Sequence, residues 1–199
     1  MANVNAQRGF TPVGTLSGAP WTDSIRAFLC PSGDSTAIYV GDAVKTGGTG
    51  GAAGDTVFGM DMEGVSTLAV ATAGGPIVGV VVGFSPNQAD LTVLHRVAST
   101  NRVAYVCTDP DTIYEVQEDS VGNDIAATQI GHNFDHVNTA GSSTTGRSKQ
   151  ELDSSDASGT STATFRLLGL VKRADNAIGA NAKWLVVANE HEYKTTTGV

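Results

Sequence analysis

Apolar residues occur along the chain in short runs of strand length, and turn-forming residues separate these runs. Residues 103–107 and 113–117 form the clearest pair, since both runs are rich in β-branched and aromatic side chains. Between them, Pro110 fixes φ, and the aspartates on either side can accept hydrogen bonds from nearby backbone N–H groups. The pattern predicts a β-hairpin with a loop at 108–112. Neither face of the second strand is purely apolar, so we expect the hairpin to lie inside a larger sheet assembly.

Further runs of strand length have the composition of buried or half-buried strands. These runs are residues 25–29, 36–40, 67–71, 77–84, 91–97, 163–171 and 182–188, with a short strand or helical turn at 125–130. About eight to ten strands at such spacings are typical of sandwiches and barrels. We therefore predict an all-β fold whose body is a β-barrel or β-sandwich, with a jelly roll as one form of it. We expect the last two strands to pack through four side chains, those of Leu168, Leu170, Trp184 and Val186.

The chain divides by composition into an arm, a body and a tail. Residues 1–22 are low in charge, lack strand or helix periodicity and carry several glycines and prolines, so we expect an extended N-terminal arm that lies on another surface. The arm residues expected to bind a partner are Asn3, Val4, Arg8, Phe10, Pro12, Val13, Leu16 and Trp21. Residues 23–190 are expected to form a single β-rich domain, and residues 191–199 a polar C-terminal tail. Long Gly/Ser/Thr loops are predicted at 46–55 and 139–147.

The composition agrees with an all-β protein and argues against two classes of partner. The 199 residues suffice for a sizeable core, and charged residues make up only 16% while glycine occurs 24 times. The net charge is −8 and the 12 Lys and Arg residues are scattered, which argues against a nucleic-acid-binding surface. The longest apolar run, residues 76–84, is broken by Gly79 and Gly83 and is shorter than the ~20 residues that a membrane helix requires. We therefore expect neither nucleic acid nor membrane as a partner.

Cys30 and Cys107 are the only cysteines, which is too few for a disulfide framework. The chain begins without an apolar leader run, so we expect a soluble protein made in the cytoplasm with reduced thiols. Both cysteines lie in apolar strand contexts, which favours inert core thiols over a reactive nucleophile. Pairing of the two stays open, although their spacing gives it no support.

Several residue patterns invite a chemical interpretation, but turn and surface roles explain them better. His132 and His136 have the i, i+4 spacing of a helical zinc pair, yet nothing around them predicts a helix. Glycine-rich residues 46–54 lack the Lys-Ser/Thr end of a phosphate loop, and no serine lies in a G-x-S-x-G turn. Three acidic pairs suit turns better than calcium or glycoside chemistry: Asp61/Glu63, Asp109/Asp111 and Asp153/Asp156. We expect no catalytic residues, no cofactor and no metal, and hence no enzyme.

Several longer stretches form one pattern along the chain. They are MANVNAQRGFTPV at the N-terminus, PSGDSTAIYVGDAVK (31–45), IVGVVVGF (77–84), YVCTDPDTIYEVQED (105–119), GRSKQELDSS (146–155) and LLGLVKRADNAIGANAKWLVVANEH (167–191). This pattern resembles a known family, the head proteins encoded near the major capsid gene in tailed bacteriophages. The resemblance implies a cement or decoration protein on the outer surface of the icosahedral capsid of the virion, made in the bacterial host cytoplasm. The implied partners are the major capsid protein and further copies of the chain, with a homotrimer preferred to a dimer.

A cement protein bridges capsid subunits through large interfaces and so stabilises the shell against the pressure of packaged DNA. That role needs rigidity and extended binding segments but no chemistry, in agreement with the residue patterns. Two alternatives of other classes remain. One is a carbohydrate-binding or fibre-associated virion β-module, and the other is a hydrolase whose carboxylates come from separate loops.

Overall fold

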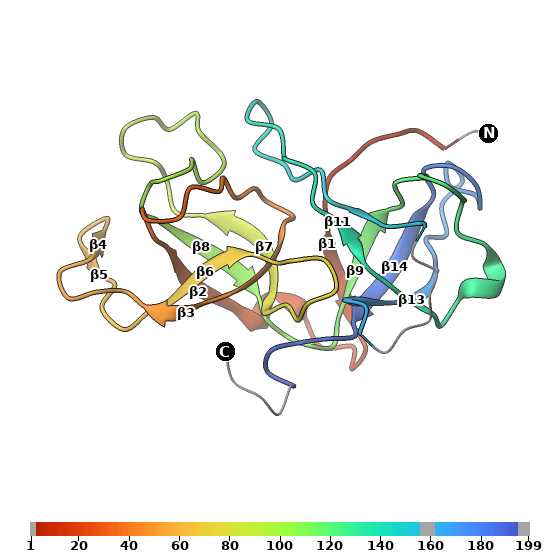
Figure 1. Cartoon of the computed structure of the whole chain (residues 1–199), viewed down its shortest axis with the longest axis horizontal. Helices are drawn as coiled ribbons and strands as arrows, with labels where there is room; N and C mark the ends of the chain where they lie inside the picture. The colour runs from red at the N-terminus through yellow and green to blue at the C-terminus, as the bar shows by residue number, and fades with distance from the viewer. Residues whose placement is uncertain (1–2, 156–161, 195–199) are drawn as a thin grey trace.

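The computed structural model describes residues 3–155 and 162–194, and nearly all of its regular secondary structure is β-strand. A closed barrel and a five-stranded sheet lie side by side along the long axis of the molecule (Figure 1). The predicted all-β fold with a barrel is therefore confirmed. In the part of the chain that the structure describes, no helix has the length and apolar character needed to cross a membrane.

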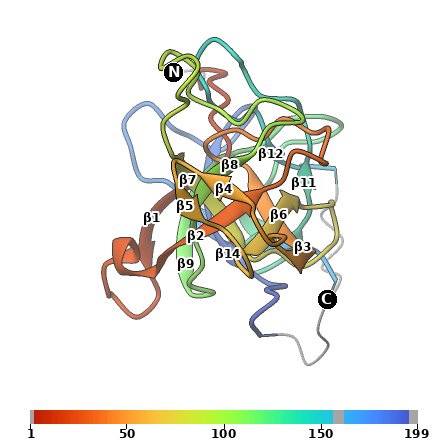
Figure 2. The same cartoon turned by 90° about the vertical axis from the view of Figure 1, so that its left-hand side faces the viewer.

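The barrel consists of five strands in the order β2-β6-β3-β7-β8 (Figure 2). Their bounds are β2 Ile25–Cys30, β3 Ala43–Gly50, β6 Ser66–Val70, β7 Gly79–Phe84 and β8 Arg102–Cys107. β2 and β6 run parallel, whereas the other neighbours are antiparallel. Buried apolar side chains, among them those of Phe28, Leu68, Val81 and Val106, pack together as one core cluster. A barrel of so few strands has an interior that side chains can fill.

Strand β3 runs through glycine-rich residues that we predicted to be a flexible loop. The prediction was wrong for residues 46–50, because β3 continues to Gly50 and pairs with β6 across an irregular register. A Cβ atom on Gly47 would lie 2.5 Å from Oγ1 of Thr67, and one on Gly51 would lie 2.0 Å from the carbonyl oxygen of Met62. Glycine at these positions allows close approach of neighbouring segments.

The second sheet has the order β1-β9-β14-β13-β10, and all of its pairs are antiparallel. Its strands are β1 Thr11–Thr15, β9 Thr112–Gln117, β14 Lys183–Ala188, β13 Phe165–Leu170 and β10 Asn133–Phe134. One face of the sheet buries a cluster that includes Tyr114, Trp184 and Val186. Ala43 and Val80 of the barrel belong to the same cluster, so the barrel and the sheet share one apolar core.

The predicted packing of the last two strands is confirmed for Trp184, Val186 and Leu170. Leu168 does not belong to this cluster, because the register between β13 and β14 shifts at this point. Leu167, which pairs with Val186, is buried in its place. A single extra residue on one strand reverses which side chains face the core.

Six shorter elements complete the described structure. They are the 3₁₀ helices η1 Trp21–Ser24 and η2 Ala127–Gln129 and the strands β4 Thr56–Val57, β5 Met60–Asp61, β11 His136–Val137 and β12 Glu151–Leu152. η2 corresponds to the short strand or helical turn predicted at 125–130. β4 and β5 form a small hairpin at the outer end of the barrel (Figure 1).

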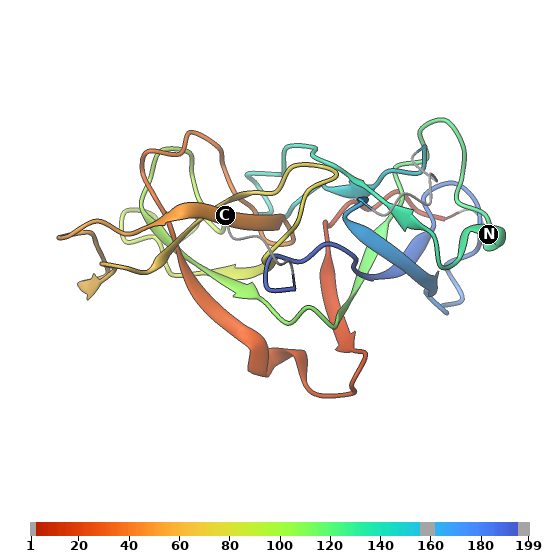
Figure 3. The ribbon, with the colours of Figure 1, turned by 60° about the horizontal axis from the view of Figure 1, so that its bottom comes forward.

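The predicted hairpin at 103–117 was wrong in its pairing, although both of its strands exist. β8 pairs with β2 and β7 in the barrel, whereas β9 pairs with β1 and β14 in the sheet. The expected turn chemistry is present, since Asp109 accepts a hydrogen bond from the backbone N–H of Asp111 at 2.9 Å. Residues 108–112 nevertheless carry the chain from one half of the molecule to the other (Figure 3). Both sides of β8 are already occupied by barrel neighbours.

The predicted division between an arm at 1–22 and a body at 23–190 does not match the packing. β1 lies at the edge of the sheet and pairs with β9, so this part of the N-terminal segment belongs to the chain's own sheet. Pro12 and the irregular register beside it are compatible with an edge strand, which needs hydrogen bonds on one side only. At the other end, His191 of the predicted tail is buried and forms a bridge with Ile77. Residues 195–199 of that tail lie outside the described part.

Two predicted strands are absent from the described structure. Residues 36–40 and 91–97 form only isolated bridges, of which one joins Ile38 to Arg96. The predicted loop at 139–147 contains one bridge between Ser142 and Arg147. Residues 91–97 belong to a long connection between β7 and β8, and that connection forms the surface described next.

Candidate interaction surface

The connection between β7 and β8, residues 85–101, lies at the top of the barrel in Figure 1. It carries exposed apolar side chains. We call this segment the leucine loop. Leu91 and Leu94 are 74% and 55% exposed, and Val97 is 38% exposed. A solvated loop does not need such side chains for its own stability, so they indicate a contact surface.

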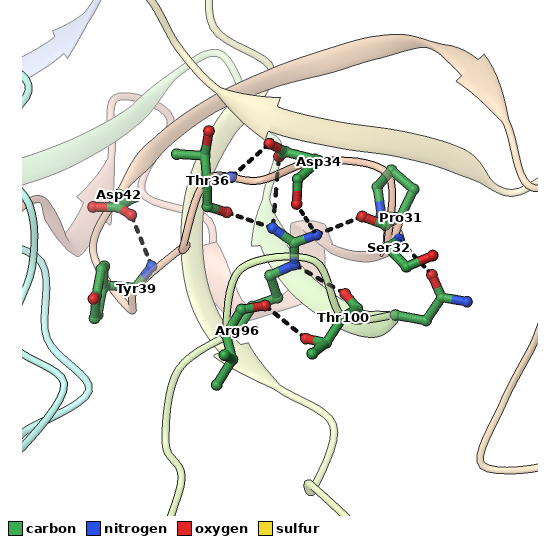
Figure 4. Close-up of polar contacts among 10 residues, drawn as sticks. Pro31, Ser32, Asp34, Thr36, Tyr39, Asp42, Arg96 and Thr100 are labelled. Atoms are coloured by element: carbon green, nitrogen blue, oxygen red, sulfur yellow. Dashed lines mark hydrogen bonds and ion pairs between the residues drawn. The ribbon is translucent and has the colours of Figure 1, made fainter.

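Arg96 fixes the leucine loop to the barrel (Figure 4). Its side chain is fully buried, and its guanidinium group donates hydrogen bonds to the carbonyl oxygens of Pro31, Asp34, Thr36 and Thr100. The carboxylate of Asp34 lies 3.7 Å from Nη1 and supplies a compensating charge. The planar guanidinium can serve several acceptors at once, whereas a lysine ammonium could not match this geometry.

Arg102, at the start of β8, holds the opposite side of the leucine loop. Its Nε donates to the carbonyl oxygen of Ser85 at 2.8 Å, and its Nη2 donates to the carbonyl oxygen of Val93 at 3.1 Å. Its Nη1 donates to the carbonyl oxygen of His95. The guanidinium carbon lies 5.3 Å from the centre of the Phe84 ring, within range of a cation–π interaction. Two buried arginines thus satisfy backbone carbonyl groups that the loop could not satisfy by strand pairing.

Burial shifts the pKa values of the ionisable groups beneath the leucine loop. Desolvation lowers the pKa of Arg96 and that of Arg102 and raises the pKa of the Cys30 thiol to about 12. The same cause raises the pKa of Asp42 to about 6, although Asp42 accepts a hydrogen bond from the backbone N–H of Tyr39 at 2.7 Å. The Tyr39 ring in turn stacks on His95 of the leucine loop, with ring centres 4.7 Å apart.

Two shallow hollows flank the beginning of the leucine loop at Pro86 and Asn87, which line both. One, of about 350 Å³, lies toward Phe58 and Val97. The other, of about 460 Å³, lies toward Leu91 and Leu94. Their linings mix apolar side chains with backbone and amide groups, and such a surface suits protein contact.

The structure separates the eight predicted partner-binding residues into three groups. Val4, Arg8, Val13 and Leu16 are exposed, and Asn3, Pro12 and Trp21 are half-buried. Asn3 is already engaged, because its amide donates to the carbonyl oxygens of Ala177 and Ala180. Phe10 cannot contact a partner, because its ring is only 1% exposed and packs in the sheet core. The prediction for Phe10 is therefore corrected.

The residues considered for chemistry lie apart from one another. His132 is exposed and His136 is buried, on a segment of short strands that is not helical. Among the residues that the structure describes, no three His, Cys, Asp or Glu side chains gather as metal ligands would. Cys30 and Cys107 are buried and unpaired, as expected for core thiols. Asp156 of the third acidic pair lies outside the described residues.

Sequence reasoning missed the two arginines that organise this surface. Arg96 and Arg102 were counted among scattered basic residues, whereas both lie beside apolar runs that supply no other charge. An isolated arginine flanked by strand-like residues is the signal that was available. The leucines were missed because their alternation with polar residues predicted a strand.

No protein-family model matches the chain, no curated protein matches its sequence, and no solved structure matches its fold.

Proposed function

We propose that the protein is a virion structural protein of the capsid cement or decoration type, which binds the outer surface of a tailed-phage head through its leucine loop. The observation that carries the proposal is the exposure of Leu91 and Leu94 on a loop whose backbone carbonyl groups accept hydrogen bonds from two buried arginines, Arg96 and Arg102. A loop held in one conformation loses little entropy when it binds, so its apolar side chains contribute more of their burial energy to affinity.

The proposal also includes self-association, because one small contact loop per chain cannot bridge capsid subunits alone. Joining several copies brings several loops to the shell at once and raises the effective concentration of each. A homotrimer is the preferred form and a homodimer the alternative. The major capsid protein is the proposed partner at the shell.

The first test measures binding of the purified protein to empty expanded capsids and to unexpanded procapsids, by sedimentation with gel quantitation. Saturable binding to the expanded shells supports the proposal, and the copy number then gives the stoichiometry per capsomer. Binding to neither kind of shell overturns it and favours a fibre-associated or glycan-binding module.

A pair of matched variants tests the surface itself. Leu94→Glu should weaken capsid binding by about tenfold or more, as expected for a buried contact residue. Leu16→Glu is the control, since Leu16 is equally exposed at 57% but lies outside the leucine loop. Loss of binding in Leu16→Glu with normal binding of Leu94→Glu would place the contact on the N-terminal segment instead.

A further inference from the structure

The hairpin β4–β5 at the outer end of the barrel carries an exposed aromatic residue in an unfavourable backbone conformation. Phe58 and Gly59 form its two-residue turn, and both have positive φ, 57° and 70°. Such a turn favours Asn-Gly or Asp-Gly, and a bulky residue with positive φ is an outlier. Phe58 is also 42% exposed, so core packing does not explain its presence. A strained and exposed aromatic side chain points to a binding role.

The surroundings of Phe58 are acidic and apolar. Met60, its neighbour on the hairpin, is also exposed. Residues 52–64 contain three acidic side chains and no Lys, Arg or His; the three are Asp55, Asp61 and Glu63. Arg102 also lines the hollow beside Phe58, but its side chain is buried and donates to loop carbonyl oxygens. A partner for this hairpin tip must therefore offer basic groups around an apolar contact.

The sheet half of the same molecule offers such a surface. Arg8, Arg173 and Lys183 line a hollow of about 160 Å³, whose lining also includes Ala6 and Val116. We call this the basic hollow. Arg173 is paired with Glu115 at 2.9 Å and with Asp175 at 3.3 Å.

Basic charge remains in excess around the basic hollow after these pairs are counted. The lining holds three basic side chains and one acidic side chain, that of Glu115, and Asp175 pairs with Arg173 from outside the lining. Lys172, next to Arg173 in the sequence, is exposed. Val4 and Ile178 are exposed on the two segments that Asn3 links by hydrogen bonds. This end thus combines positive charge with apolar side chains.

We propose that the β4–β5 hairpin of one copy docks into the basic hollow of a second copy of this chain, head to tail. The hairpin lies at the outer end of the barrel and the sheet forms the other half of the molecule (Figure 1), so the two surfaces of one chain cannot meet each other. A contact between two different surfaces is heterologous, and repeated rotation about one axis closes it into a ring. The inference rests on the self-association included in the proposed function and names its interface.

The test uses variants that each remove one side of the contact. Phe58→Asn supplies the residue that the turn favours, so the hairpin should stay folded while the aromatic contact is lost. Arg8→Glu combined with Lys183→Glu reverses charge in the basic hollow and leaves the hairpin intact. Sedimentation velocity of the purified chain should show self-association that weakens with added salt, and each variant should weaken it by about tenfold or more. Leu16→Asn is the matched control and should associate as the wild type does.

Mixing the two variants gives the decisive result. Phe58→Asn retains its basic hollow and the charge-reversed variant retains its hairpin, so a one-to-one mixture should form a pair that neither forms alone. A monomeric wild-type chain, a Phe58→Asn variant that associates normally, or a mixture that stays monomeric would each overturn the inference. Reduced capsid binding of Phe58→Asn with unchanged self-association would also overturn it, since the hairpin would then contact the capsid protein.

The two proposals fail separately. A monomer that still binds expanded capsids contradicts the head-to-tail contact and the proposed self-association, but not binding to the capsid. An oligomer that binds no capsid contradicts only the cement function.

Discussion

Phe10 lies stacked on Phe165, with ring centres 4.3 Å apart and planes 17° from parallel. Phe10 comes from the N-terminal segment and Phe165 from β13, so this contact ties the start of the chain to the core of the sheet. Tyr114 and His136 each meet both rings edge-on, which completes an aromatic cluster.

Phe10→Ala should destabilise the protein by about 3–5 kcal/mol, because it removes a fully buried aromatic side chain and leaves a cavity. Urea denaturation followed by tryptophan fluorescence measures the effect, since Trp184 lies in the same core. Leu16→Ala in the same segment is exposed and should change stability by about 0.5 kcal/mol or less. A Phe10→Ala variant as stable as this control would contradict the packing.

Arg96→Met should cost about 3–5 kcal/mol, because it leaves buried carbonyl groups and the Asp34 carboxylate without their partner. Hydrogen exchange should become faster in residues 31–36 and 96–101, which this guanidinium holds together. Arg96→Lys should fall between wild type and Arg96→Met, since it keeps the charge but loses the planar donor set. Unchanged exchange in Arg96→Met would show that the loop is held by other contacts.

Glu118 should make stability fall as the pH rises from about 4.5 to about 7. Burial raises the pKa of this carboxyl from 4.5 to about 7, against the lowering effect of hydrogen bonds from Ile125, Ala182 and Trp184. Between these values the unfolded chain loses the proton and the folded chain keeps it, so ionisation favours unfolding. Below the window both states are protonated, and above it the effect is constant.

The measurement for Glu118 is the urea-unfolding free energy of wild type and Glu118→Gln across this pH window. Asp42 and His191 also titrate with shifted pKa values, so the difference between the two proteins is the quantity to follow. That difference should change with pH in the direction given above. A difference that is flat from pH 4.5 to 7 would refute the assignment to Glu118.

Gly51→Ala should destabilise the barrel by roughly 1–3 kcal/mol, because its Cβ atom would lie 2.0 Å from the carbonyl oxygen of Met62. Gly33→Ala is the matched control, since nothing lies within 4 Å of its Cβ position. Thermal unfolding measures the stability of the two variants, and Gly51→Ala should unfold at the lower temperature. Equal stability would mean that glycine at position 51 reflects loop flexibility, as the composition alone predicted.

The sequence identified strands well and their partners poorly. The runs at 103–107 and 113–117 are strands because β-branched and aromatic residues favour extended backbone wherever it pairs. Which strand pairs with which is decided by contacts distant in sequence, and β8 finds both of its neighbours in the barrel. Phe10 shows the same limit, since nothing near it in the sequence reveals a stacking partner in β13.

The interaction surface was harder to predict than the fold. Residues 91–97 alternate as a strand does, but the guanidinium groups of Arg96 and Arg102 donate to the carbonyl oxygens of this segment and its neighbours, which stay in a loop. Periodicity reports which side chains avoid water, and it carries no information about which backbone groups a long side chain will reach. Exposed Leu91 and Leu94 follow from that arrangement.

The order of strands in the sheet has a consequence for synthesis on the ribosome. β1 is made first, but its neighbour β9 follows only after the whole barrel, and the ring that covers Phe10 comes from β13. At elongation rates of about 5–20 residues per second, Phe10 waits roughly 8–30 s for Phe165. The barrel strands can therefore assemble while β1 has no partner, and the Phe10 ring lacks its stacking partner for the whole of that interval.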